Sequence, residues 1–141
     1  MATNFFTEEV SFSLKEKRKR KAWLKQIAES EKHSISELNY IFCSDEYLHS
    51  INVEYLDHDD YTDIITFDNS VEDGIIEGDI FISIDRVKEN AEIEKVALEK
   101  ELSRVISHGL FHLLGFKDKS KAEANLMRSK EEFAINLFEK I

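Results

Sequence analysis

The sequence contains no proline, a single cysteine and only four glycines among its 141 residues. Without proline, polyproline recognition segments and proline-rich linkers are excluded. The single cysteine, Cys43, excludes an internal disulfide and a cysteine-based zinc cluster, and it fits a reducing cytoplasm. Apolar runs are only a few residues long, and the first residues lack the plan of a secretory signal. We therefore predict one cytoplasmic domain over residues 1–141, without membrane contact.

Positive charge is also scarce, because the formal net charge is −10. The basic residues are concentrated, however, since residues 15–25 carry a local charge of +6. We call this segment the basic stripe, and its cations are Lys15, Lys17, Arg18, Lys19, Arg20, Lys21 and Lys25. A stripe of this kind is either a solvated helix face or a surface that binds RNA phosphates.

The spacing of apolar residues predicts interleaved strands and helices. Alternation predicts a half-buried strand at 9–14, and an apolar stripe predicts a helix at 15–31. The other expected elements are strands at 36–43, 63–67 and 78–84 and helices at 45–55, 86–91, 96–114 and 121–140. Asp73 and Gly74 predict a turn that joins two of the strands as a hairpin. The order predicts an α/β fold with a small mixed sheet.

The segment from His108 to Asp118 has the spacing of a metal site. Two histidines four residues apart on a helix project from one face and reach one ion. A third ligand ten residues after His108 would lie about 15 Å along a continuous helix, so the chain has to turn back first. Gly115 stands where that turn is needed. The pattern predicts that His108, His112 and Asp118 bind a metal and leave a coordination position open for water.

Two alternatives bear on this motif. Histidines at this spacing in a buried helix are often packed residues with hydrogen-bonded rings. If the metal is present, peptide hydrolysis of the thermolysin type is disfavoured, because that mechanism needs a glutamate directly after the first histidine. The residue there is Gly109, which cannot carry a proton, so the activated water itself has to be the nucleophile.

The motif resembles the signature of the YbeY family, metal-dependent endoribonucleases of ribosomal RNA maturation. The resemblance rests on His108-Gly109-x-x-His112-Leu113-x-Gly115-Phe116 and extends to the segments 52–55, 59–67 and 78–80 in order and spacing. It implies a mixed four-stranded sheet packed against helices, of which the sequence predicts about five. It also implies one zinc ion, or another divalent cation, in a single YbeY-like domain over residues 1–141.

Two positions depart from the family pattern. Asp118 stands where the family usually has a third histidine, and Lys117 precedes it where the family has aspartate. A carboxylate is a competent ligand but should make the ion a weaker Lewis acid. Leu56 occupies the position of a family arginine implicated in phosphate binding, so Lys117, Lys119 and Arg86 are candidates to replace that contact.

The sequence thus predicts a metal-dependent endoribonuclease that hydrolyses RNA with a metal-activated water. The catalytic and metal-binding residues are His108, His112 and Asp118. The expected partner is ribosomal RNA or the small ribosomal subunit, contacted through the basic stripe and Lys117. The alternatives are a metal-dependent hydrolase of another substrate, such as a peptide, and a non-catalytic ribosome-associated RNA-binding factor with a structural metal.

Overall fold

The sheet combines three parallel strands with one antiparallel strand. In the computed structural model, which describes residues 2–141, the strands are β1 (Ala2–Glu8), β2 (Ser34–Cys43), β3 (Ile64–Asp68) and β4 (Ile75–Ser83). Their order is β1-β2-β4-β3, and only β3 runs antiparallel to its neighbour among these strands. The predicted hairpin is confirmed, because β3 and β4 pair across a turn in which Gly74 has a φ of 81°.

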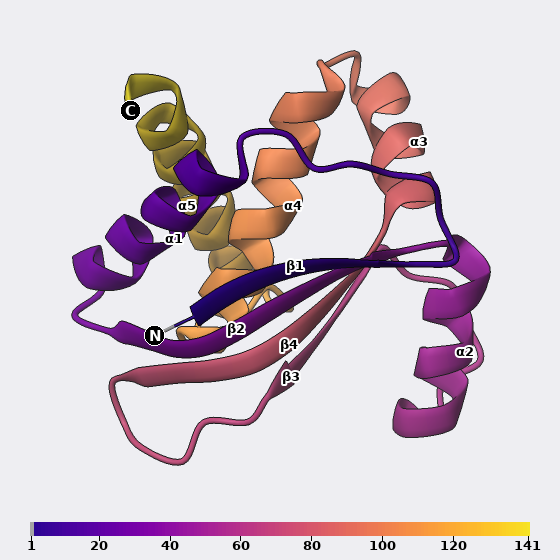
Figure 1. Cartoon of the computed structure of the whole chain (residues 1–141), viewed down its shortest axis with the longest axis horizontal. Coiled ribbons are helices and arrows are strands. Elements are labelled where there is room, and N and C mark those ends of the chain that lie inside the picture. Colours follow the sequence, from indigo (N-terminus) through magenta and orange to yellow (C-terminus); the bar gives the residue numbers. More distant parts are fainter. Residues whose placement is uncertain (1) are drawn as a thin grey trace.

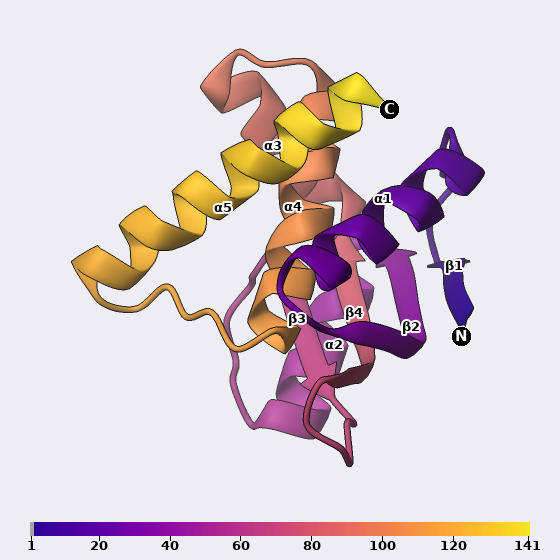
Figure 2. The ribbon, with the colours of Figure 1, turned by 90° about the vertical axis from the view of Figure 1, so that its left-hand side faces the viewer.

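Five helices pack around the sheet in residues 2–141 (Figure 1). They are α1 (Lys17–Ser30), α2 (Asp45–Leu56), α3 (Ile84–Glu94), α4 (Leu98–Leu113) and α5 (Lys121–Lys140). Helix α4 lies against β3 and β4, while α1 lies against β2. Helix α5 crosses α4, as Figure 2 shows. The predicted α/β class with a small mixed sheet is confirmed.

Residues alternate between two apolar layers along the strands. Ile80 and Ile82 face the larger core under α1, α4 and α5, whereas Ile65 and Phe81 face a smaller cluster under α2. Two buried hydrogen bonds connect elements of the larger core, one joining β2 to α4 and the other joining α1 to α5. The Tyr40 hydroxyl donates to the Ile106 carbonyl of α4 at 2.8 Å, and the Trp23 indole donates to the Ala134 carbonyl of α5 at 2.8 Å. The first of these bonds fixes α4 to β2 within the C-terminal half of the helix.

The predicted strand at 9–14 is wrong. This segment is irregular, and the strand that pairs with β2 is β1, Ala2–Glu8. Glu9 has a φ of 53°, so the chain turns out of the sheet directly after β1. Val10, Phe12 and Leu14 still pack against the larger core. Their alternation reports burial on one side, which a chain crossing the core surface can achieve without strand pairing.

Candidate metal centre

His108 and His112 lie side by side on the C-terminal half of α4. Their Nε2 atoms are 2.9 Å apart, and their side chains are 14% and 26% exposed. The neighbours of the two rings along the helix, Leu110 and Phe111, are buried in the larger core. The helix thus uses one face to pack and presents both imidazoles along its edge, at the border between core and solvent.

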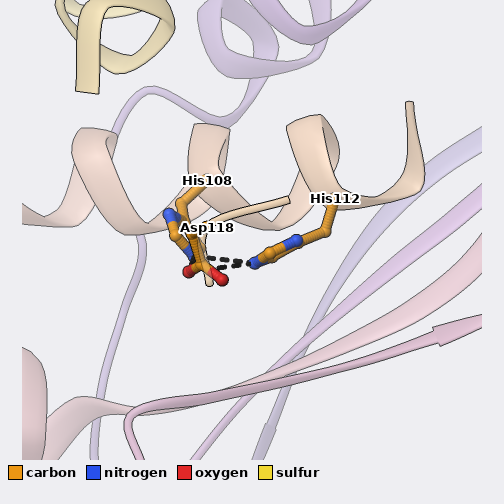
Figure 3. Close-up of side chains that lie close together, drawn as sticks. All are labelled: His108, His112 and Asp118. Carbon is orange, nitrogen blue, oxygen red and sulfur yellow. Dashed lines mark hydrogen bonds and ion pairs between the residues drawn. The ribbon is translucent and has the colours of Figure 1, made fainter. Parts of the chain in front are cut away.

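The chain turns back after α4 and brings Asp118 to the two rings (Figure 3). Gly115 has a φ of 102°, in the left-handed region, and its amide donates to the His112 carbonyl at 3.0 Å. Asp118 Oδ2 then lies 3.3 Å from His108 Nε2 and 3.5 Å from His112 Nε2. The turn that the sequence predicted at Gly115 is confirmed, and it places the carboxylate between the rings.

The far nitrogen of each ring has a partner of its own. His112 Nδ1 lies 3.0 Å from the carbonyl oxygen of Phe116, which can only accept a hydrogen bond. His108 Nδ1 lies 2.5 Å from Glu131 Oε2 on α5. When Nδ1 donates in both rings, the lone pair of each Nε2 points toward Asp118. This is the orientation that metal-bound histidines adopt.

The three side chains fit a divalent cation. Their ligand atoms lie within 4.8 Å of one another, and the set combines two imidazole nitrogens with one carboxylate oxygen. Two neutral nitrogens and one anionic oxygen are donors that zinc accepts in catalytic sites, where a water completes the coordination. His108, His112 and Asp118 are therefore the residues of this structure that could hold the ion.

Gly109 faces the sheet, where side chains of β3 and β4 pack directly against it. A Cβ atom built on Gly109 would lie 3.0 Å from two side-chain carbons of Ile80 and 3.1 Å from Ile64 Cδ1. The position after His108 consequently faces the core and has no room for a glutamate. A general base of the thermolysin type is excluded at this position by packing as well as by residue type.

The basic stripe is divided by the structure. Its exposed cations are Lys15, Lys17, Arg18, Lys21 and Lys25, and Lys19 is half-buried over the Phe138 ring. The prediction that Arg20 contacts RNA is wrong, because this side chain is fully buried. Its Nε donates to the Lys15 carbonyl and its Nη1 to the Ser103 hydroxyl. Burial lowers the pKa of Arg20, against the opposing effect of Glu99.

The candidates to replace the family arginine differ in their freedom. Leu56, at the family position, is 39% exposed. Arg86 is engaged by Asp45, with Nε to Oδ1 at 3.0 Å. Lys117 and Lys119 are exposed on either side of Asp118. Of these candidates, the two lysines lie in the segment that supplies a metal ligand.

Glu131 is the site residue that the sequence interpretation missed. It follows His108 by 23 residues and lies on another helix, so the local motif does not contain it. A signal was nevertheless present, because Glu131 occupies the buried stripe of α5 with Met127, Ala134 and Phe138. A charged residue at an apolar stripe position requires a buried partner.

The chain is similar to several known proteins. The model of the family described as "Endoribonuclease YbeY" matches residues 3–139. A protein of that name from Cytophaga hutchinsonii is 56% identical over 133 residues, covering 94% of this chain and 93% of its own. The namesake from Flavobacterium johnsoniae is 52% identical over 133 residues, covering 94% and 95%. The solution structure of TM1509 from Thermotoga maritima superposes with a TM-score of 0.68 at 25% identity, covering 97% of this chain and 89% of that one.

Proposed function

This chain belongs to the YbeY family of endoribonucleases, and we propose that it cleaves ribosomal RNA with a divalent cation held by His108, His112 and Asp118. It is a hydrolase of RNA phosphodiester bonds, as its family membership shows. The observation that carries the proposal is the convergence of three ligand atoms, within 4.8 Å of one another, across the Gly115 turn. We propose zinc as the ion, because two imidazoles and one carboxylate suit it.

Each residue of the site has a distinct role in the proposed reaction. A bound divalent cation would lower the pKa of a coordinated water and stabilise negative charge on the phosphoryl group. His108 and His112 present their Nε2 lone pairs, and their Nδ1 partners hold the rings in that orientation. Asp118 adds one negative charge to the ligand set. Lys117 and Lys119, exposed beside Asp118, would attract the phosphates of the RNA strand.

We propose that residues 1–141 act as one domain in the cytoplasm, and that the exposed cations of the basic stripe contact ribosomal RNA or the small ribosomal subunit. The cytoplasmic location is supported by the single, buried cysteine. Within residues 2–141, no helix has the length and apolar character to cross a bilayer.

The test combines metal analysis with RNA cleavage. The wild type should contain about one equivalent of metal and cleave RNA, whereas His112→Ala and Asp118→Ala should lose both metal and cleavage because each removes a ligand. His33→Ala is the matched control, since His33 lies outside the group of His108, His112 and Asp118 and its Nδ1 is 2.6 Å from the Glu31 carbonyl oxygen. Cleavage that persists without metal would contradict the proposed mechanism.

A further inference from the structure

A row of charged side chains lies on the side of His108 that faces away from Asp118. His108 Nδ1 is 2.5 Å from Glu131 Oε2, and Arg104 Nη1 is 3.4 and 3.5 Å from the two Glu131 oxygens. Arg104 also binds the Glu101 carboxylate through three contacts of 2.7 to 3.1 Å. Glu101 and Glu131 are only 3% and 4% exposed. Two buried carboxylates therefore share one guanidinium, and one of them also reaches the metal centre.

The distances show which partner each carboxylate serves. The shortest contact of Arg104 is to Glu101, at 2.7 Å, and its contacts to Glu131 are longer by more than half an ångström. The shortest contact of Glu131 is to the His108 ring. Glu101 is thus the main partner of Arg104, while Glu131 is placed by the arginine and bonded to the histidine.

Arg104 is the cation that both buried carboxylates contact. Buried carboxylates need such a partner, because a charge removed from water without one is costly. Contacts with both glutamates raise the pKa of Arg104, although burial alone lowers it, so the arginine stays charged. The Glu131 carboxylate lies next to His108 Nδ1, on the side of the ring opposite the proposed ion. A divalent cation on Nε2 would therefore be stabilised through the ring.

We propose that Glu131 is a positioning residue of the metal centre, fixing the His108 ring and strengthening Nε2 as a ligand. The inference rests on the proposed function, because His108 is a metal ligand only there. Outer partners of this kind orient the ligand ring and make it more basic, and their loss lowers metal affinity about 10- to 100-fold. His112 obtains its orientation from the Phe116 carbonyl, so Glu131 is the partner that a side-chain substitution can change.

The test compares Glu131→Gln and Glu131→Ala with Glu132→Gln in the full chain. Glu132 is the matched control, because it is exposed and lines the same cleft of about 410 Å³ between α3, α4 and α5. Zinc affinity is measured by competition with a chelator. Glu131→Gln keeps the size and a hydrogen-bond acceptor but removes the charge, so we expect a loss of about tenfold. Glu131→Ala should lose about 100-fold, and Glu132→Gln should match the wild type.

A second measurement does not depend on metal. Ring ¹⁵N chemical shifts of metal-free protein should show His108 with its proton on Nδ1 in the wild type and a mixture of tautomers in Glu131→Ala. If Glu131→Ala does not fold, Glu131→Gln decides the question alone, with its unfolding temperature as the check on structure. Equal zinc affinity in wild type and Glu131→Gln would overturn the role of Glu131 alone. A wild type that binds no zinc would overturn this role together with the proposed function.

Discussion

Two faces of the molecule are built in opposite ways. One is the edge of α4 that carries His108 and His112, and the other is the exposed side of α1 that carries most of the basic stripe. On α4, the Nδ1 atom of each histidine is bonded to Glu131 or to the Phe116 carbonyl, and the two Nε2 atoms lie 3.3 and 3.5 Å from the Asp118 carboxylate. On α1, most of the cations are exposed. A site that performs chemistry needs fixed distances, whereas a surface that attracts a polyanion needs only local charge. The comparison teaches that the two faces should respond to different perturbations.

The largest effect we expect in this comparison comes from neutralising the basic stripe. The triple variant Lys17→Gln, Arg18→Gln and Lys21→Gln should weaken RNA binding on the order of tenfold near 0.15 M salt, and should lower the salt slope by about 2 for a single strand. Metal content should stay at the wild-type value. Binding is measured by fluorescence anisotropy over a salt series.

The control for the stripe is a triple variant of equal charge at exposed lysines on other helices, namely Lys88→Gln, Lys100→Gln and Lys140→Gln. A general field effect would weaken RNA binding equally in both triple variants. That result would mean that the stripe is only a solvated helix face, and the contrast between the two faces would disappear.

A smaller effect is expected from Gly109→Ala, which disturbs the packing of α4 against the sheet next to His108. The new methyl group would press on Ile80 and Ile64, at a cost of about 1–3 kcal/mol for overpacking. The gain in helix propensity, about 1 kcal/mol, offsets only part of this. We expect a net loss of about 1 kcal/mol in the free energy of unfolding, measured by urea denaturation. A variant more stable than the wild type would show that α4 moves freely over the sheet.

The smallest effect should come from Arg20→Met. This substitution tests whether Arg20 is a buried residue of the core or part of the surface that contacts RNA. The methionine keeps an apolar stem in the core and removes a buried cation whose Nη2 has no hydrogen-bond partner within residues 2–141. The free energy of unfolding should change by less than about 1 kcal/mol, and RNA affinity should be unchanged. A loss of RNA affinity in Arg20→Met would show that Arg20 contributes to RNA binding despite its burial.

Local patterns predicted much of the fold and the grouping of His108, His112 and Asp118. Helix periodicity placed the histidines on one face of α4, and Gly115 marked the turn that brings Asp118 back. These features depend on residues close in sequence, where geometry follows from the chain itself. Strand β1 was missed because its pairing with β2 is set 35 residues away, as in the register of Asn4 with Asn39.

Long-range contacts account for the other errors. Arg20 stands among exposed cations in the sequence, but the approach of α4 and α5 buries it between Ser103 and Phe138. Glu131 reaches His108 for the same reason, because two helices cross there. In both cases a charged side chain occupies a position that packing, rather than local periodicity, decides.

The crossing of α5 over α4 has a consequence for the order of biosynthesis. The ribosome makes both histidines and Asp118 before it makes Glu131, and α5 cannot cross α4 until its own residues have emerged. If Glu131 positions His108 as proposed, a nascent chain that ends before α5 would carry the three ligands but lack the carboxylate that orients the His108 ring. A ribonuclease synthesised on the ribosome, next to RNA, would therefore bind its metal ion weakly until α5 had packed against α4.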